Sequence, residues 1–420
     1  MNATRMPGRF ALFTFHFAVA VVLAGCSSQP VEVVETREAM STLITVHVVG
    51  PSDAKAHEAL AAAWQEMDLG IATLDWHRAP SEAWLKKDPK AREDPAQQPS
   101  DVWRINHEAG RGAAEVDPMV TSCLAVAKEI HKLSGGAFDP TVQPVLNVWR
   151  EAAKQNKMPS DEDLAKACAL VGLDKIDIVA DMAARPPSDL PIMPPGTPPP
   201  TPEELIKAIY YVQLPKKGMG LDLSGVAKGF IIGRMVGRMR EFGVRAALVQ
   251  AGGDIYAIGE KPADPKKPGG DRRWGIGVQD PRFPDDPARL FTAIRVKDKA
   301  VTTSGHYYRG YTVEGKRFSH IVDPKTGRPV DNHIASVTVV ATDPGVADAL
   351  STAVAVMGVE KGMAMIEDLK DVECLILEAA APEAAAPEPK PEAVRLIPHR
   401  SQGFAAMEYK PEAEPGDAKK

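Results

Sequence analysis

The stretch from Leu221 to Ile255, LDLSGVAKGFIIGRMVGRMREFGVRAALVQAGGDI, carries the local pattern that decides the fold prediction. It predicts, in order, a strand ending at Asp222, a turn at Ser224-Gly225, a helix over Val226–Phe242 and a strand over Ala246–Val249 ending at Gly252-Gly253. Free N–H groups at the start of such a helix, the helix dipole and the nearby Lys228 suit a phosphate. Paired glycines after a strand let a flat ligand approach the backbone. Both glycine patterns are also ordinary turns, so these alternatives stay open.

Outward from this stretch, helical and strand-like patterns follow one another without strict alternation. Helical spacing of apolar residues covers Ala54–Leu74, Val120–Leu133, Val346–Met357 and Glu360–Leu369. Strand-like runs cover Met40–Val49, Trp274–Gln279, Leu290–Val296, Ala300–Thr303, Ala335–Ala341 and Glu373–Leu377. This mixture predicts an α+β fold with several antiparallel strands.

The composition is that of a globular protein, with 420 residues of which 44% are apolar and 25% charged. The net charge is −6 and there is no basic stripe, so we expect no nucleic-acid partner. Cys123, Cys168 and Cys374 lie among aliphatic neighbours, which indicates buried small side chains without a chemical role.

The N-terminus predicts export and lipidation. Arg5 and Arg9 precede an apolar run that is short for a membrane span and typical of a signal peptide. The run ends in Leu23-Ala24-Gly25-Cys26, which resembles the lipobox of bacterial lipoproteins, so residues 1–25 are expected to be removed and Cys26 to carry lipid. The alternative is an ordinary signal peptide followed by a chance cysteine. We therefore expect a lipid anchor on the periplasmic side of a bacterial membrane, and Ser27 favours the outer membrane.

The rest of the chain divides by composition. We expect a lipidated tether over 26–38, one folded domain over 39–378, an Ala/Pro/Glu linker over 379–393, a terminal strand over 394–409 and a disordered tail over 410–420. Nine prolines within residues 182–202 predict an exposed insertion, and the strand-like segments on either side, Ile176–Val179 and Ala208–Leu214, could pair. The polar segment Lys86–Ser100 is expected to be a surface loop.

Two further segments contain candidate chemistry. Asp348 and Thr352 are four residues apart in a predicted helix, so they share a face, and their oxygens suit a hard cation such as Mg²⁺. The alternative is that Asp348 faces water and Thr352 bonds its own helix backbone. His320, predicted in a strand, and Asp323 are close enough to orient one another, which makes His320 a candidate general base. The alternative is a structural histidine beside an ordinary turn.

Nine segments, taken in order, closely resemble the ApbE family of FAD:protein FMN transferases: MSTLITVHV, INHEAG, VDPMV, SGGAFDPTVQPVLNVW, DLSGVAKGF, AGGDIYAIG, TTSGHYYRGY, SHIVDPKTGRPV and ADALSTAVAVMG. The likeness runs from about Met40 to Leu377 with near-usual spacing. It implies a two-lobed α+β architecture, related to the T-fold, with mixed, largely antiparallel sheets, flanking helices and an FAD cleft between the lobes.

The resemblance also implies which residues form the site. Mg²⁺ would be bound by Asp348, Thr352 and the backbone carbonyl of Gly225, and His320 would activate the incoming hydroxyl. The FAD contacts would be Met40, Ala137, Phe138, Asp139, Lys228, Thr326 and, by spacing, His77 in preference to Trp76. The chain departs from the family around Trp76 and His77 and in the expanded link over residues 83–104, which puts the aromatic contact in question.

The implied reaction is transfer of FMN from FAD, the substrate, to a threonine or serine hydroxyl of an acceptor flavoprotein, with Mg²⁺ as cofactor and AMP as the released product. The acceptors would be flavin-bearing subunits of membrane redox complexes, reached from a lipid anchor. Two alternatives stay open: an FAD pyrophosphatase that gives FMN and AMP, and a flavin-binding lipoprotein.

Overall fold

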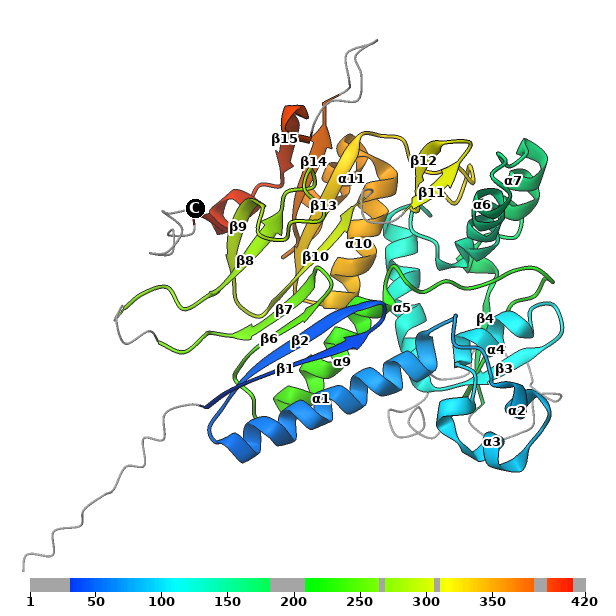
Figure 1. The fold of residues 1–420 in the computed structure, drawn as a ribbon, viewed down its shortest axis with the longest axis horizontal. Coiled ribbons are helices and arrows are strands. Elements are labelled where there is room, and N and C mark those ends of the chain that lie inside the picture. The colour runs from blue at the N-terminus through cyan, green and yellow to red at the C-terminus, as the bar shows by residue number, and fades with distance from the viewer. Residues whose placement is uncertain (1–30, 182–207, 264–268, 306–309, 381–390, 411–420) are drawn as a thin grey trace, which may run out of the picture.

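The computed structural model describes residues 31–181, 208–263, 269–305, 310–380 and 391–410 (Figure 1). The expected signal peptide, Cys26 and the proline-rich insertion over 182–202 lie outside these ranges, as do residues 381–390 of the linker and 411–420 of the tail. Within the described ranges, no helix combines the length and the apolar character needed to cross a membrane.

An eight-stranded sheet forms the centre of the molecule, in the order β1-β2-β6-β7-β10-β13-β14-β15 (Figure 1). Its strands are β1 (Val31–Ala39), β2 (Thr42–Gly50), β6 (Ala246–Ala251), β7 (Asp254–Gly259), β10 (Lys299–Gly305), β13 (Ile334–Ala341), β14 (Glu373–Ala379) and β15 (Leu396–Arg400). Every neighbouring pair in this sheet is antiparallel. The central strands are rich in β-branched residues and bury both faces, as in the buried run of β13.

Helices cover one face of this sheet. They are α1 (Asp53–Leu74), α5 (Pro118–Leu133), α9 (Ala227–Glu241), α10 (Pro344–Met357) and α11 (Val359–Glu367). The helix α10 packs against β10, β13, α9 and α5. Its first two turns are buried on nearly all sides, as its largely apolar sequence requires. This enclosed position explains why the carboxyl group of Asp348, on α10, is shielded from water.

A small sheet covers the opposite face, in the order β16-β9-β8. Its strands are β8 (Trp274–Gln279), β9 (Leu290–Val296) and β16 (Glu408–Tyr409). Trp274, Ile294 and Phe404 from this side share one buried cluster with Val340 and Leu375 of the large sheet. The large sheet is therefore enclosed between helices and a second sheet.

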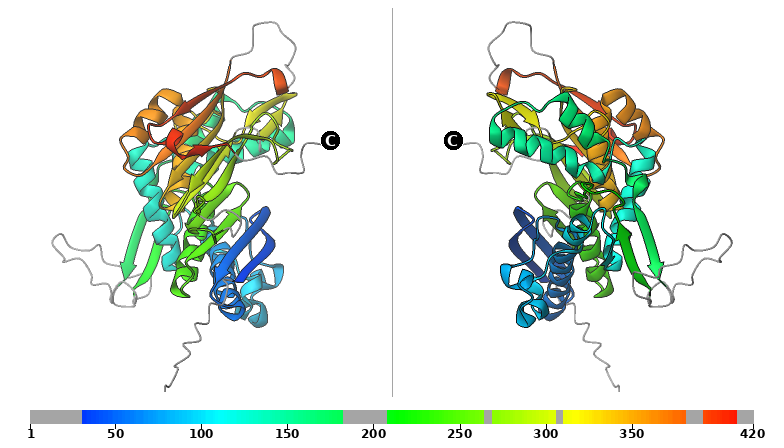
Figure 2. Two further views of the ribbon diagram at one scale, coloured as in Figure 1. Left: turned by 90° about the vertical axis from the view of Figure 1, so that its left-hand side faces the viewer. Right: turned by 90° about the vertical axis from the view of Figure 1, so that its right-hand side faces the viewer.

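The remaining elements lie to one side of the large sheet, on the right in Figure 1. They include a three-stranded antiparallel sheet in the order β3-β5-β4, with β3 (Ala113–Val116), β5 (Ile209–Gln213) and β4 (Asp177–Asp181), and the hairpin of β11 (Gly310–Val313) with β12 (Lys316–Ser319). The helices here are α2 (Glu82–Leu85), α3 (Pro89–Glu93), α4 (Asp101–His107), α6 (Gln143–Gln155) and α7 (Asp161–Cys168). Figure 2 shows α6 and α7 beside the β11–β12 hairpin, while β4 and β5 stand at another side of the molecule.

The structure confirms the α+β class, the antiparallel pairing and most of the predicted elements. The strands β8 and β9 have the predicted bounds, and the helices α1, α5, α9 and α10 match within a few residues. The two segments that flank the proline-rich insertion pair as β4 and β5. Cys123 and Cys374 are fully buried and Cys168 is partly buried, as expected of small side chains without a chemical role.

Two predictions near the N-terminus and the helix α9 are wrong. The tether cannot extend to Glu38, because Val31–Ala39 pairs along its whole length with β2 through a turn at Met40 and Ser41, which both have positive φ. No strand ends at Asp222, because the side chain of Asn106 bonds both the N–H and the carbonyl of Leu221, which makes that backbone unavailable to a neighbouring strand.

Three further predictions are corrected. The segment Lys86–Ser100 is a capped helical segment, because Asp88 and Asp94 cap α3 and a short 3₁₀ turn over Pro95–Gln97. The terminal segment over 394–409 is two strands in two different sheets, β15 and β16, with a turn between them. His320 follows β12 and does not lie in a strand.

Candidate functional site

The starts of the helices α9 and α10 lie in close contact. A Cβ atom built on Gly229 would lie 2.7 Å from the carbonyl carbon of Pro344 and 2.8 Å from Cβ of Asp348. The N–H of Gly229 donates a hydrogen bond of 3.0 Å to Oδ2 of Asp348. Glycine is needed at this position because a side chain would separate the two helices. The contact brings the DLSGVAKGF and ADALST segments together.

The turn before α9 lies against the next turn of α10. A Cβ atom built on Gly225 would lie 3.3 Å from Oγ1 of Thr352 and 3.2 Å from the ring of Phe138. The hydroxyl of Ser304, on β10, lies 3.4 Å from Oγ1 of Thr352 and 2.7 Å from Oγ of Ser351. The structure thus places Gly225, Asp348 and Thr352, the three residues assigned to the metal, at one junction.

The carboxyl group of Asp348 is buried together with a second acid and one cation. Burial, and then the negative charge of Asp254, raise the pKa of Asp348 to about 7, while Lys228 and the N–H of Gly229 act in the opposite direction. Lys228 pairs with the carboxylate of Asp254, whose side chain is almost fully buried. Two acids facing one lysine leave a buried negative charge for which a further cation is the natural partner.

This junction fits Mg²⁺ better than a metal that needs several histidine or cysteine ligands. Among the residues that the structure describes, no group of three or more His, Cys, Asp or Glu side chains could hold a metal. Protein-bound Mg²⁺ takes oxygen ligands, often one or two carboxylates with waters and substrate phosphates. Asp348, the hydroxyl of Thr352 and the carbonyl of Gly225 would supply oxygen ligands of this kind.

The loop that contains Ala137, Phe138 and Asp139 borders the same junction. Phe138 contacts the Gly225 turn, as described above, and both Ala137 and Phe138 are buried. Asp139 uses Oδ1 to accept from the N–H and hydroxyl of Thr141, and Oδ2 to accept from the N–H of Leu173. The Asp139 carboxylate therefore holds the loop in shape.

The turn over residues 323–327 lies against this loop. Cε of Lys325 is 3.7 Å from the position that a Cβ of Gly136 would take. Thr326 is exposed, and its hydroxyl accepts a hydrogen bond of 3.3 Å from the N–H of Arg328. The carboxylate of Asp323 accepts from the N–H of Lys325 and so caps its own turn. His320, half-buried, precedes this turn directly after β12.

Met40 lies at the end of the β1–β2 hairpin, near the turn that joins β6 and β7. A Cβ atom on Gly252 would lie 2.9 Å from Cβ of Thr42, two residues after Met40. Met40 is half-buried and packs against the main core. The glycine pair Gly252-Gly253 has positive φ at both positions and forms a two-residue hairpin turn, with Asp254 next to it. The glycine pair is therefore a tight turn, and the approach of a flat ligand to it stays a prediction.

His77 lines a cavity of about 380 Å³ together with other flat or polar side chains. The lining residues are Trp76, His77, Trp103, Asn106, His107 and Gln143. The rings of Trp76 and His77 lie 3.6 Å apart, and those of Trp103 and His107 stack at 4.7 Å. Walls of this kind suit a planar ring. Trp76 and His77 both line the cavity, so the preference for His77 stays a prediction.

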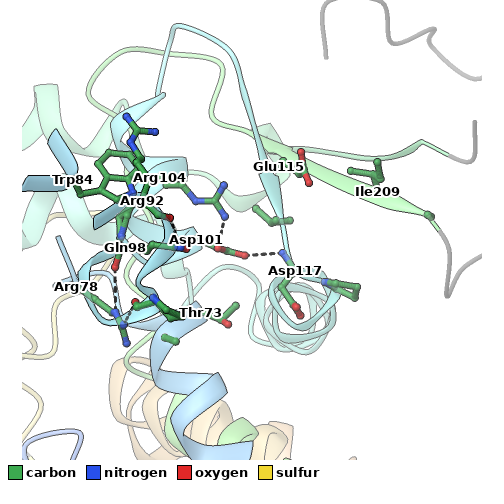
Figure 3. A pocket seen from close by; sticks show the side chains of 16 residues that line it. Thr73, Arg78, Trp84, Arg92, Gln98, Asp101, Arg104, Glu115, Asp117 and Ile209 are labelled. Carbon is green, nitrogen blue, oxygen red and sulfur yellow. Dashed lines mark hydrogen bonds and ion pairs between the residues drawn. The ribbon is translucent and has the colours of Figure 1, made fainter. Parts of the chain in front are cut away.

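Figure 3 shows a larger hollow of about 610 Å³. Arg78 and Arg104 line the hollow, while the residues that precede them, His77 and Trp103, line the cavity. Arg78 donates to the carbonyl oxygens of Pro95 and Gln98. The hollow contains none of the three proposed metal ligands and is lined only in part by the expanded link.

Sequence reasoning missed several residues that the structure brings to this region. The available signal in the sequence was an acid directly after the glycine pair. In the structure this acid, Asp254, is buried beside the hairpin turn. Ser304 and Ser351 lie within segments already selected, but a hydroxyl carries no distinctive pattern. Asn106 and Gln143 become visible only once the chain is folded, because they contact residues more than 70 positions away.

The sequence of this chain is similar to those of known proteins. The model of the ApbE family matches residues 87–376. The FAD:protein FMN transferase of Klebsiella pneumoniae is 30% identical over 280 residues, covering 66% of this chain and 75% of the relative. That of Treponema pallidum is 30% identical over 274 residues, covering 65% and 69%.

Solved structures show the same fold. The flavin transferase ApbE from Vibrio cholerae has a TM-score of 0.63 at 21% identity, covering 90% of this chain and 99% of that one. The ApbE protein from Thermotoga maritima has a TM-score of 0.63 at 27% identity, covering 90% and 100%. A family model that spans most of the folded chain, together with these relatives, makes this protein a member of the ApbE family.

Proposed function

We propose that this protein transfers the FMN part of FAD to a threonine or serine hydroxyl of an acceptor flavoprotein and releases AMP. The observation that carries the proposal is the junction of α9 and α10, where Gly225, Asp348 and Thr352 meet beside Lys228. A helix start with a lysine and a hard-cation site is the arrangement that a pyrophosphate needs. The relatives named FAD:protein FMN transferase support the same reaction.

In the proposed reaction the acceptor hydroxyl oxygen forms a bond to the FMN-side phosphorus of FAD. The bond between that phosphorus and the bridging oxygen breaks, and AMP leaves with the bridging oxygen. His320 takes the hydroxyl proton. Mg²⁺ bound by Asp348, Thr352 and the carbonyl of Gly225 would supply Lewis-acid neutralisation of the phosphate charge. The protein supplies the rest by holding the dinucleotide in place.

We further propose that Cys26 carries a lipid that holds the enzyme at the periplasmic side of a bacterial membrane, with the outer membrane favoured by Ser27. An anchored enzyme would meet acceptors that are subunits of membrane redox complexes. Membrane fractionation of the full chain and of a Cys26→Ala variant tests this part. Recovery of both proteins in the soluble fraction would overturn it.

The reaction is tested by incubating the protein with FAD, Mg²⁺ and a candidate acceptor flavoprotein. Flavin fluorescence on the denatured acceptor band, with AMP in solution, supports transfer. Free FMN and AMP with an unlabelled acceptor would replace the proposal with an FAD pyrophosphatase, and unchanged FAD would replace it with flavin binding alone. Chelation of the metal with EDTA is expected to stop labelling, and added Mg²⁺ is expected to restore it.

The variant His320→Ala is expected to transfer flavin about a hundredfold more slowly, because a positioned general base contributes roughly that factor or more. FAD should still bind, because the proposed metal ligands and the aromatic cavity are unchanged. Single-turnover labelling and FAD titration measure the two quantities separately. The exposed His57, on α1, is the matched control, and His57→Ala should behave as the unmodified protein. Unchanged labelling in His320→Ala would contradict the role of a base.

A further inference from the structure

The segment from Gly220 to Gly225 connects the aromatic cavity to the junction of α9 and α10, where the three proposed metal ligands lie. The side chain of Asn106, which lines the cavity, accepts a 2.6 Å hydrogen bond from the N–H of Leu221 and donates one of 2.9 Å to its carbonyl. The side chain of Gln143, also in the cavity wall, crosses Gly220, where a Cβ would lie 2.8 Å from its Cδ. The same segment ends at Gly225, against Thr352. Its position therefore sets how the cavity and the junction face one another.

Arg150, on α6, contacts both sides of this connection. Its guanidinium carbon lies 4.6 Å from the ring centre of Trp76, a cavity residue. Its Nη2 donates a 3.4 Å hydrogen bond to Oδ2 of Asp222. Its Nη1 donates a 2.9 Å hydrogen bond to Asn147, which fixes the guanidinium on its own helix. One planar group thus contacts the aromatic wall and the segment that leads to Gly225.

Asp222 connects Arg150 to the turn that carries Gly225. Its Oδ1 accepts from the N–H of Ser224 at 3.0 Å and from the Ser224 hydroxyl, so it shapes the turn that carries Gly225. Its own N–H donates to the carbonyl of Pro140 at 2.7 Å. The Asp222 side chain is 4% exposed, so Arg150 is the cation that accompanies a buried carboxylate. Removing that cation leaves a buried charge with fewer partners.

We propose that Arg150 is a positioning residue that holds the aromatic cavity in register with the Gly225 turn, so that one dinucleotide can occupy both. The inference rests on the proposed function, because it takes FAD as the molecule that spans them. A ring of FAD would lie between the flat side chains while its pyrophosphate lies at the turn. Such a ligand gains affinity from both sites only if the protein fixes the distance between them before the ligand binds.

An ordinary surface ion pair would not have this effect. Exposed pairs contribute little, because water screens them. The Arg150 side chain is only 30% exposed, and its guanidinium contacts both a buried acid and an indole ring. Lysine could replace the charge but not the planar stacking, because its ammonium is a compact point charge. The variant Arg150→Lys should therefore retain part of the effect, whereas Arg150→Met should lose all of it.

The test compares a ligand that spans both sites with one that occupies only the turn. Calorimetry or equilibrium dialysis in the presence of Mg²⁺ gives the Kd of FAD and of inorganic pyrophosphate for the unmodified protein, Arg150→Met and Arg150→Lys. We expect Arg150→Met to weaken FAD binding about tenfold and pyrophosphate binding less than about twofold, with Arg150→Lys intermediate for FAD. Lys154→Met, one turn further along α6 and exposed, is the control and should change neither Kd.

Equal loss for FAD and pyrophosphate would overturn the proposal, because Arg150 would then act on the turn or on phosphate alone. Unchanged FAD binding in Arg150→Met would overturn it as well. If Arg150→Met does not fold, the comparison rests on Arg150→Lys, for which an FAD Kd equal to that of the unmodified protein has the same consequence. These results are separate from failure of the proposed function, which would appear as an unmodified protein that binds FAD but labels no acceptor.

Discussion

Replacing Asp348 with asparagine is expected to lower the rate of flavin transfer by about a thousandfold or more, because a lost metal ligand removes several kcal/mol of charge stabilisation. Asparagine has nearly the same size, and its side-chain oxygen can still accept the hydrogen bond from the N–H of Gly229. The substitution therefore removes the charge while leaving the packing of α9 against α10 intact. Single-turnover labelling of an acceptor at saturating FAD and Mg²⁺ measures the effect.

Thermal unfolding separates the loss of the charge from damage to the fold. Because burial raises the pKa of Asp348 to about 7, its ionised form is costly to bury without a cation. The metal-free Asp348→Asn protein should therefore unfold at a temperature no lower than that of the unmodified protein. Added Mg²⁺ should raise the unfolding temperature of the unmodified protein only, because a ligand stabilises the state that binds it.

Normal flavin transfer by the Asp348→Asn variant would contradict the proposal that Asp348 is a metal ligand. So would an Asp348→Asn protein that Mg²⁺ stabilises as strongly as it stabilises the unmodified protein. Asp343→Asn tests whether any acid of α10 would have the same effect. Asp343 caps the start of that helix by accepting from the N–H of Val346. Because asparagine caps a helix about as well as aspartate, this variant should lose less than about 1 kcal/mol of stability and should still bind Mg²⁺.

The elements that the sequence predicted correctly are those with strong local periodicity. The strand β8 alternates between buried and more exposed positions, and the helix α5 carries apolar residues at helical spacing. The periodicity of apolar residues in these elements can be recognised within a short stretch of sequence. The same holds for α10, whose apolar sequence reports its enclosed position.

The wrong predictions arise where distant contacts decide the conformation. Residues 31–38 look like a polar tether, yet they form β1 because β2 supplies a complete antiparallel partner. Leu221 looks like the end of a strand, but Asn106, 115 residues earlier, takes both of its backbone groups. Residues 394–409 look like one strand, but the carboxylate of Glu373 accepts from the N–H of Gly403 and helps to turn the chain between two sheets. None of these contacts has a local signature.

The candidate site divides in the same way. The spacing of Asp348 and Thr352 on one helix face is visible in sequence, and so is the glycine-rich start of α9. The pairing of Lys228 with Asp254 is not, because it depends on the β6–β7 hairpin folding back beside α9. The contribution of Arg150 depends on a stack against Trp76, from another part of the chain. The sequence thus indicates the proposed metal ligands, and folding brings together the groups that surround and orient them.

The same substitution, glycine to alanine, is expected to have opposite effects at two positions of α9. At Gly229 a Cβ would lie 2.7 Å from the carbonyl carbon of Pro344, and real Cβ atoms essentially never come within 3.0 Å of such a neighbour. The neighbour is backbone at the start of α10, so relief requires the whole helix to move. Overpacking of this kind costs about 1–3 kcal/mol, which corresponds to a fall in unfolding temperature of roughly 1–4 °C for a chain of this size.

Asp348 lies one turn after Pro344, so a shift of α10 away from α9 also separates Asp348 and Thr352 from Gly225. We therefore expect Gly229→Ala to reduce flavin transfer about a hundredfold, because displacement of about 1 Å in a positioned site costs that much.

Gly237, two turns further along α9, is exposed and has no heavy atom within 4 Å of a built Cβ. Alanine there should raise stability by up to about 1 kcal/mol through helix propensity and leave transfer unchanged. Thermal unfolding and flavin labelling of an acceptor, measured on both variants, test these opposite expectations. Equal stability and full transfer in Gly229→Ala would mean that the spacing of the two helices does not set the geometry of the metal site, because α10 would then have moved without consequence.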